Sequence, residues 1–168
     1  MRLDLGSIIH QPGGVIPFSI ELDFSSLEFG GSFPAAEPVT FSGQVRNEAD
    51  VLVLTGTVST TLHCICDRCA ASFTRPFHQA VEAILVQELM DEKNEDDWTF
   101  LLQDGEADLL DIATTAFVLN LDTKFLCSAD CKGLCAVCGK NLNEGDCDCK
   151  PEPDPRLAVL AQLLQDKE

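Results

Sequence analysis

The sequence predicts an α+β protein with an antiparallel, or more strongly curled barrel-like, β-sheet domain, a few helices and a C-terminal cysteine-rich module. Three observations predict this class. Apolar and polar residues alternate over long stretches of the N-terminal part, as they do in half-buried strands. A segment that follows has apolar residues at helical spacing, and six of the nine cysteines lie in residues 127–149. We expect a β-rich core domain over residues 1–105 and a second part over residues 106–168.

The best-defined strands are expected at residues 39–45 and 52–62. In both segments apolar residues or glycine recur at every second position, and the segment 47–50 between them has the composition of a turn. Together the two segments predict a long hairpin. Weaker strand candidates are residues 2–5 and 16–24, and one more strand is expected at residues 98–102.

A second hairpin is expected to reverse at residues 64–69 and to continue through residues 73–86. Proline has no backbone N–H to donate to a neighbouring strand, so Pro76 predicts an edge position or a bulge in this second strand. The following residues 88–97 are strongly acidic. We expect a solvated loop there, and a docking site is the alternative.

Two helices are expected in the second part of the chain. Asp108 has the side chain of a helix N-cap, and the pattern that follows ends near Asn120. A second, short helix is expected after Asp154 and Pro155, which suit a cap and a first-turn position. The apolar face of the first helix comprises Leu109, Ile112, Ala113, Ala116 and Phe117.

Composition decides against two classes of function. The formal net charge of the 168 residues is −17, whereas binding to a nucleic acid gains most of its affinity from Lys and Arg. A basic protein partner suits an acidic surface better. No stretch approaches the roughly 18 consecutive apolar residues of a membrane span, and the N-terminal residues lack the pattern of a signal peptide. We therefore expect a cytoplasmic protein with reduced cysteines and no membrane partner.

Clustered thiols in a reducing compartment are typical of zinc sites, because four thiolates satisfy the tetrahedral coordination that zinc prefers. Two Cys-x-x-Cys turns each supply two thiolates from one loop. They are Cys66-Asp67-Arg68-Cys69 and Cys135-Ala136-Val137-Cys138. After the second turn, Gly139 can adopt the positive φ that lets backbone amides face a thiolate. The expected cofactor is zinc, and residues 127–149 are expected to form a zinc module.

The spacing of the cysteines favours two sites. Eight residues separate the two pairs of the first expected site, which comprises Cys135, Cys138, Cys147 and Cys149. The second expected site joins the tip of the hairpin to the module and comprises Cys66, Cys69, Cys127 and Cys131. One or two zinc ions, and the partition of the ligands, stay open at this point. The remaining Cys64 lies at strand spacing, which favours a small buried residue over a ligand.

No sequence pattern of a catalytic site is found. Catalytic zinc keeps one coordination position open and usually has histidine or carboxylate ligands beside a general base, as in His-Glu-x-x-His. That motif, the phosphate-binding Gly-x-x-x-x-Gly-Lys, the dinucleotide fingerprint and Gly-x-Ser-x-Gly are all absent from the sequence. We expect a protein that is not an enzyme, without a small-molecule substrate.

Two segments together carry a resemblance to a known family. They are Cys66-Asp67-Arg68-Cys69 and the segment that begins at Cys127 and ends at Cys149, with Asn141-Leu142-Asn143 inside it. The combination resembles the YceD family, whose members are called large ribosomal RNA subunit accumulation proteins. The resemblance covers most of the chain, and Cys64 is an addition to the usual hairpin pattern. It implies a cytoplasmic bacterial or plastid-type protein that is needed for normal accumulation of large-subunit ribosomal RNA and has no catalytic activity.

Taken together, these features predict a non-enzymatic ribosome-biogenesis factor that contacts a basic ribosomal protein or a precursor particle of the large subunit. Zinc would fix the shape of the C-terminal module, and ribosomal RNA would be an indirect partner. One alternative is a redox switch in which oxidation of Cys66 and Cys69 releases zinc. The other is a direct RNA-binding protein that uses Arg68, Lys132 and Lys140.

Overall fold

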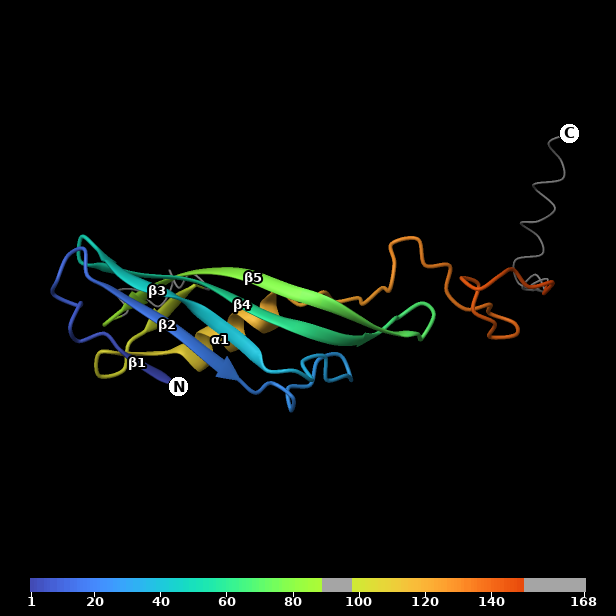
Figure 1. The fold of residues 1–168 in the computed structure, drawn as a ribbon, viewed down its shortest axis with the longest axis horizontal. Helices are drawn as coiled ribbons and strands as arrows, with labels where there is room; N and C mark the ends of the chain where they lie inside the picture. Colours follow the sequence, from blue (N-terminus) through green and yellow to red (C-terminus); the bar gives the residue numbers. More distant parts are fainter. Residues whose placement is uncertain (89–97, 150–168) are drawn as a thin grey trace, which may run out of the picture. The chain divides into compact units, whose positions relative to one another are not determined.

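The computed structural model describes residues 1–88 and 98–149 (Figure 1). The chain forms two compact units, one of residues 1–64 and 72–124 and the other of residues 65–71 and 125–168. Most of the predicted acidic loop and the whole predicted C-terminal helix lie outside the described residues. The domain boundary between residues 105 and 106 stays a prediction.

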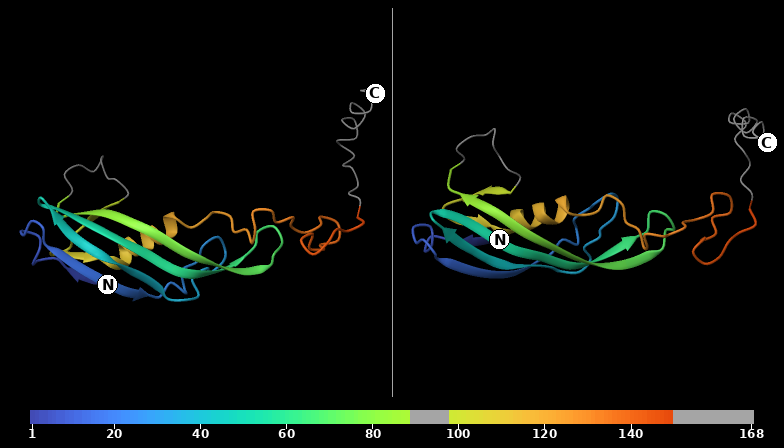
Figure 2. Two further views of the ribbon diagram at one scale, coloured as in Figure 1. Left: turned by 45° about the horizontal axis from the view of Figure 1, so that its top comes forward. Right: turned by 90° about the horizontal axis from the view of Figure 1, so that it is seen from above.

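The first unit is built on a five-stranded sheet with the strand order β2-β3-β4-β5-β6 (Figures 1 and 2). β2 pairs antiparallel with β3, and β3 pairs antiparallel with β4. The sheet is open in the described part of the chain, because β2 and β6 form its two edges. The α+β class is therefore confirmed, and the barrel-like closure is not found. The strands are β2 (Val15–Leu22), β3 (Val39–Glu48), β4 (Val51–Ile65), β5 (Ser72–Val86) and β6 (Thr99–Leu101).

The long hairpin predicted from the alternating pattern is the β3–β4 pair. Its turn is shorter than expected, since only Ala49 and Asp50 lie between the strands, with φ of 52° and 69°. Asn47, predicted as part of the turn, is instead a buried residue of β3. Its side-chain amide donates to the carbonyls of Ile8 and Ile9, at 2.7 and 2.9 Å. Asn47 therefore fastens an N-terminal loop to the end of the hairpin.

The predicted antiparallel arrangement was wrong for one strand, because β6 runs parallel to β5. The expectation of an antiparallel sheet came from strands that follow one another through tight turns. β5 and β6 are separated by residues 87–98, and a connection of about a dozen residues is long enough to return the chain in the parallel direction. β6 contacts β5 only over Ile84–Val86, so Pro76 has no β6 neighbour and lies at the predicted edge position.

The core of the first unit lies between one face of the sheet and the helix α1 (Leu109–Leu119), which Figure 2 shows across that face. Buried residues recur at every second position along β3 and β4. Phe117 of α1 is fully buried and makes edge-to-face ring contacts with Phe24 and Phe77, at centroid distances of 5.3 and 5.1 Å. The predicted apolar face of this helix is confirmed, since all five of its residues are buried.

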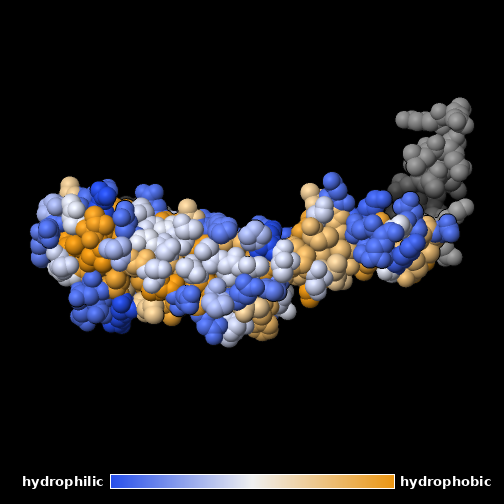
Figure 3. Space-filling view, viewed as in Figure 1, coloured by the Kyte–Doolittle hydropathy of each residue, from blue (hydrophilic) through white to orange (hydrophobic). Residues whose placement is uncertain are grey.

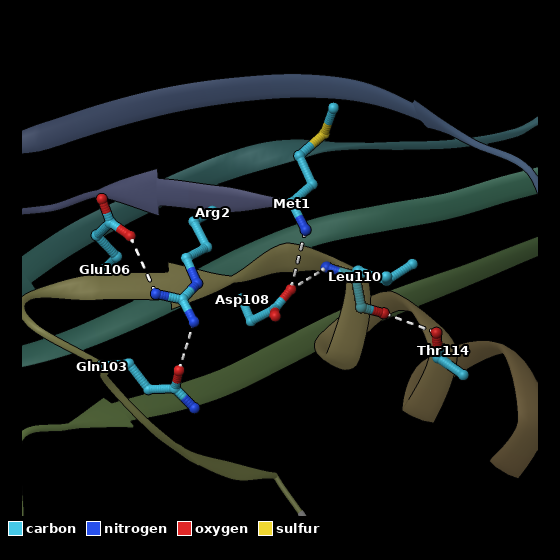
Figure 4. A network of polar contacts seen from close by, with 7 residues as sticks. All are labelled: Met1, Arg2, Gln103, Glu106, Asp108, Leu110 and Thr114. Carbon is cyan, nitrogen blue, oxygen red and sulfur yellow. Dashed lines mark hydrogen bonds and ion pairs between the residues drawn. The ribbon is translucent and has the colours of Figure 1, made fainter.

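A small two-stranded sheet of β1 (Arg2–Asp4) and β7 (Glu106–Asp108) leads into α1. Asp108 is the predicted N-cap, and its carboxylate accepts from the backbone N–H of Leu110 at 3.0 Å and from the amino group of Met1 at 3.2 Å (Figure 4). Arg2 reaches the neighbouring Glu106 at 3.6 Å. β7 was missed in the sequence because three residues are too few to show an alternating pattern.

α1 is the only helix in the described part of the chain, so the expectation of a few helices is met by one there. No helix among the described residues has the length and apolar character needed to cross a membrane.

Candidate metal centres

Eight of the nine cysteines gather into two groups of four in the second unit. Within each group all four sulfur atoms lie within 4.8 Å of one another. We call the first group the hairpin cluster; it comprises Cys66, Cys69, Cys127 and Cys131. We call the second group the knuckle cluster; it comprises Cys135, Cys138, Cys147 and Cys149. The structure thus brings together the two sets of residues that the spacing favoured.

The sulfur distances in the hairpin cluster fit a tetrahedral metal ion. Four thiolates on zinc, with Zn–S bonds of about 2.3 Å, would stand about 3.8 Å apart. The Sγ atoms of Cys66 and Cys131 are separated by 3.8 Å, and those of Cys69 and Cys127 by 3.6 Å. A disulfide would need about 2.05 Å. All nine cysteines lie in the described residues, and none forms a disulfide. The clusters are therefore suited to hold a metal ion.

The hairpin cluster takes two thiols from the turn between β4 and β5. That turn is closed by a hydrogen bond from the Ala70 N–H to the Cys66 carbonyl at 2.8 Å, with Ala70 at φ 56°. The turn is also tied to the chain after residue 124. The backbone N–H of Asp67 donates to the carbonyl of Phe125 at 2.9 Å, and the Asp67 carboxylate accepts from the Phe125 N–H at 2.6 Å. This pairing places Cys127 beside Cys69 across a separation of 58 residues.

A second tie runs through Arg68. Its guanidinium donates to the carbonyl of Cys131 at 3.0 Å, and its own carbonyl accepts from the N–H of Leu134 at 3.1 Å. Gly133, the residue before Leu134, has a φ of +78°, and a Cβ added there would lie 3.0 Å from the Arg68 carbonyl oxygen. A glycine is therefore required where the cysteine-rich segment passes the hairpin turn.

The knuckle cluster begins with a tight turn at Cys135. The N–H of Gly139 donates to the Cys135 carbonyl at 2.9 Å, and Gly139 has the predicted positive φ, +72°. The N–H of Val137 points at the Cys135 sulfur, at 3.4 Å. Backbone amides that face a thiolate favour its ionised form, which is the form that binds a metal ion.

The thiols of the hairpin cluster differ in acidity. Backbone hydrogen bonds, first from Cys127 and then from Arg68 and Cys69, lower the pKa of Cys66 to about 6. Hydrogen bonds to Cys66 and Cys69 raise the pKa of Cys127 to about 12. A backbone hydrogen bond from Ala71 lowers the pKa of Cys69, but burial and the contact with Cys66 outweigh it and the pKa is raised. Cys66 is thus a thiolate at neutral pH, and Cys69 and Cys127 keep their protons.

The knuckle cluster repeats this arrangement. Backbone hydrogen bonds from Cys138 and Val137 lower the pKa of Cys135 to about 6. The hydrogen bond to Cys138, together with burial, raises the pKa of Cys149 to about 12. A backbone hydrogen bond from Cys149 lowers the pKa of Cys147, but the contact with Cys135 and burial outweigh it and the pKa is raised. Each cluster therefore has at least one thiolate ready for a cation and further thiols that must lose protons when the cation binds.

Two residues at the clusters were missed in the sequence analysis. Asn143 donates from its side-chain amide to the sulfur of Cys131 at 3.3 Å, and this hydrogen bond is the largest cause of the lowered pKa of Cys131. Asp67 fixes the path of the chain before Cys127. The pair of asparagines at 141 and 143 was noted as part of a motif, but sequence spacing gives no sign of which sulfur a side-chain amide reaches. Cys64, in contrast, is buried in β4 and belongs to neither cluster.

The fold and the two clusters define an α+β protein with a pair of four-cysteine sites able to hold metal ions. The family model described as large ribosomal RNA subunit accumulation protein YceD matches residues 54–164, about two thirds of the chain. The chain belongs to this family. The matched region includes both clusters, β5 and α1.

Individual relatives are more distant. A protein of Arabidopsis thaliana, named large ribosomal RNA subunit accumulation protein YCED homolog 1, chloroplastic, is 26% identical over 168 residues, which are 81% of this chain and 52% of that protein. The Zea mays protein of the same name is 26% identical and covers 98% of this chain and 66% of its own length. An uncharacterized protein of Mycobacterium tuberculosis is 25% identical over a region that covers 98% of this chain and 81% of that protein. The chain thus spans about half the length of the Arabidopsis relative. No solved structure matches.

Proposed function

We propose that this protein is a non-enzymatic ribosome-biogenesis factor of the cytoplasm, which supports accumulation of large-subunit ribosomal RNA by holding a basic ribosomal protein or a precursor particle of the large subunit. The family is named for the accumulation of large-subunit ribosomal RNA. The contact with a basic partner is our inference, and the distribution of charge is the observation that carries it.

The charge of the first unit is one-sided. Its residues include 19 Asp and Glu but only 5 Lys and Arg. Two of those cations are paired within the unit: Arg2 with Glu106 at 3.6 Å, and Arg75 with Asp122 at 2.6 Å. The unit therefore has 14 more acidic than basic residues, and this excess of negative charge repels phosphate and attracts basic protein segments.

The open face of the sheet supports a polar mode of contact. This face points away from α1 and toward the viewer in Figure 3, where its middle is pale and holds no continuous apolar patch. Exposed Glu21, Glu48 and Glu82 lie on three of its strands. The neighbouring outward positions of β3 and β4 are mostly hydroxyl residues, namely Thr40, Ser42, Thr55, Thr57 and Ser59. Binding here would use ion pairs and hydrogen bonds, which suit a transient assembly factor.

Zinc is the ion that we propose for both clusters. Eight cysteine thiols and no other side chain make up the two sets, and zinc prefers such all-sulfur tetrahedral sites when its role is structural. Four thiolates leave no position for a substrate, which supports a role without catalysis. Each loaded site would carry about two negative charges and would add to the acidity of the protein.

The test is affinity purification of the tagged full-length chain from growing cells, with and without nuclease, with proteins identified by mass spectrometry and RNA by sequencing. We expect basic large-subunit ribosomal proteins that remain bound after nuclease and are released by about 0.5 M salt, which screens ion pairs. Large-subunit RNA with proteins that are lost after nuclease would instead indicate direct RNA binding. Enrichment of neither class would contradict the proposal.

A charge variant makes the test specific. Replacing three exposed carboxylates on the open face, Glu21→Gln, Glu48→Gln and Glu82→Gln, removes charge without changing side-chain size. We expect recovery of the ribosomal proteins to fall several-fold, as it does when complementary charges are removed from an interface. Thr57→Val is the matched control on the same face, because it changes a hydroxyl and no charge.

The redox switch predicted at Cys66 and Cys69 is a second candidate. Those two cysteines are buried, and the exposed thiols of the clusters are Cys127 and Cys138. Oxidation needs an accessible sulfur with thiolate character. Treatment of the zinc-loaded chain with mild peroxide tests this idea. Release of zinc with loss of partner binding would support a switch, whereas cysteines that stay reduced would leave only the structural role.

A further inference from the structure

Asn143 connects the two clusters. It lies in the loop between Cys138 and Cys147 of the knuckle cluster, yet its side-chain amide donates to the sulfur of Cys131 in the hairpin cluster, at 3.3 Å. Asn143 itself is exposed, while Cys131 is 5% exposed and the hydrogen bond between them is partly buried. A residue supplied by one site thus touches a candidate ligand of the other.

The position of Asn143 depends on the fold of the knuckle. Its backbone N–H and its side-chain amide both donate to the side-chain oxygen of Asn141, at 3.1 and 2.9 Å. Asn141 is in turn bridged to Leu134, and the N–H of Leu142 donates to the carbonyl of Gly133 at 2.9 Å. These contacts hold the loop 139–146 against the segment that precedes Cys135. A metal ion that fixes the two ends of this loop would therefore also fix Asn143.

A further bond closes the connection from the other side. The Asn143 side-chain oxygen accepts from the backbone N–H of Lys132 at 2.8 Å. Lys132 directly follows Cys131, and only residues 132–134 separate Cys131 from Cys135. Asn143 therefore holds Cys131 by its sulfur and by the next peptide group at once.

Such a contact can change metal affinity. A neutral N–H that donates to a ligating thiolate stabilises the charged sulfur and fixes its direction. Loss of an outer hydrogen-bond partner of a metal ligand typically costs about 10- to 100-fold in metal affinity.

We propose that Asn143 is a positioning residue that couples the two clusters, so that zinc bound in the knuckle cluster raises the zinc affinity of the hairpin cluster. Because coupling between two binding equilibria is reciprocal, zinc in the hairpin cluster raises the affinity of the knuckle cluster by the same factor. This inference rests on the proposal that both clusters bind zinc.

The experiment compares zinc-binding constants of the full-length chain, measured by competition with a chromogenic chelator under reducing conditions. Cys66→Ser with Cys69→Ser leaves only the knuckle cluster, and Cys135→Ser with Cys138→Ser leaves only the hairpin cluster. We expect the overall constant for two zinc ions in the unchanged chain to exceed the product of the two single-site constants by about tenfold, which lies within the usual range of coupling between sites.

Asn143→Asp removes the side-chain N–H, which donates to both Cys131 and Asn141, and keeps the acceptor oxygen. The carboxylate keeps the acceptor for the Lys132 N–H but has no N–H for Cys131, so we expect the tenfold excess to disappear. Asn143→Ala removes all three side-chain hydrogen bonds of Asn143, and we expect the tenfold excess to disappear in this variant too. Asn141→Asp is the charge control, because it adds the same charge to the same loop and keeps the oxygen that holds Asn143, while it loses the hydrogen bond from the Asn141 amide to Glu144. The excess should persist in that variant.

A spectroscopic readout checks the contact itself. In the cobalt-substituted chain, loss of the N–H donor should shift the sulfur-to-cobalt charge-transfer band of the hairpin cluster in Asn143→Asp and leave it in place in Asn141→Asp. If Asn143→Asp still binds two zinc ions and changes neither the tenfold excess in the overall zinc constant nor the charge-transfer band, the proposed coupling is overturned. If the unchanged chain binds no zinc, the proposal of zinc sites itself fails.

Discussion

At the scale of single residues, the contrast between Cys66 and Cys127 describes the chemistry of a cluster. Both thiols belong to one group of four sulfurs, yet the pKa of Cys66 is about 6 and that of Cys127 is about 12. Backbone N–H groups stabilise the Cys66 thiolate, whereas hydrogen bonds with Cys66 and Cys69 favour the protonated form of Cys127. The cluster without metal is thus partly protonated, and a metal ion that binds there would have to compete with those protons.

This competition predicts proton release on zinc binding. At pH 7.5 the thiols with raised pKa, Cys69 and Cys127 in one cluster and Cys147 and Cys149 in the other, are protonated. We therefore expect release of at least two protons for each zinc ion, and calorimetry in buffers of different ionisation enthalpy measures this number. Because protons and zinc compete for the same thiols, the zinc affinity should decrease as the pH is lowered. The decrease should become steeper below about pH 6, where Cys66 and Cys135 also become protonated. An affinity that does not change between pH 6 and 8 would contradict these thiols as the ligands.

The two groups of four cysteines were predictable at this scale because short spacing limits where thiols can lie. Cys135 and Cys138 must share a turn, and eight residues bring the next pair back. The contact of Asn143 with Cys131 was not predictable, because it depends on the path of the loop between those pairs. Whether the eight cysteines bind zinc stays a prediction.

At the scale of elements, α1 shows how a local signal can fix a boundary. Asp108 was predicted as the N-cap, and its carboxylate accepts from the Leu110 N–H at 3.0 Å. Burial raises the pKa of Asp108, but the hydrogen bond from the Met1 amino group, followed by that from Leu110, outweighs this effect and lowers it. The charged form of the cap is therefore favoured in the folded protein.

Removing this cap should weaken the first unit. We expect Asp108→Ala to lower the free energy of unfolding by about 1 kcal/mol at pH 7, as is typical for loss of an N-cap, and Asp108→Ser to recover most of it. Thermal unfolding measures both variants. Because the pKa of Asp108 is lowered in the folded state, its stabilising effect is present above the ordinary pKa and is lost as the pH falls through the folded value. A difference between the aspartate and alanine chains that grows in acid would contradict this account.

Other elements show the limits of local patterns. The strands of the long hairpin were predictable because their alternation of buried and exposed residues continues over many positions. The direction of β6 was not predictable, because the path of the connecting chain determines whether the next strand runs parallel or antiparallel to β5. β7, with three residues, is defined by pairing with β1 at the other end of the unit.

At the scale of the whole molecule, the two units are stabilised by different means. The first unit has an apolar core that includes Phe41, Leu54 and Phe117, all fully buried, and its one cysteine, Cys64, belongs to neither cluster. The second unit has eight clustered cysteines among polar loops and turns, and small segments of this kind usually depend on a metal ion or another crosslink.

Metal removal should therefore affect the two units unequally. With a strong chelator under reducing conditions, we expect backbone amides of residues 65–71 and 125–149 to lose protection from hydrogen exchange, while amides of β3 and β4 up to residue 64 keep theirs. Hydrogen exchange read by mass spectrometry measures both regions in one experiment. Equal loss in both units would mean that the metal holds the whole chain, and no loss in either would mean that the clusters need no metal.

The claim on which this account depends most is that each of the two clusters holds one zinc ion. Its most direct test is the zinc content of the full-length chain purified from growing cells without added metal, measured by elemental mass spectrometry. We predict two zinc ions per chain, a lower content after either Cys66→Ser with Cys69→Ser or Cys135→Ser with Cys138→Ser, and an unchanged content in the control Cys64→Ser. A chain with one zinc ion whose content does not change when Cys66 and Cys69 are replaced would contradict the hairpin site, and a chain without zinc would contradict both.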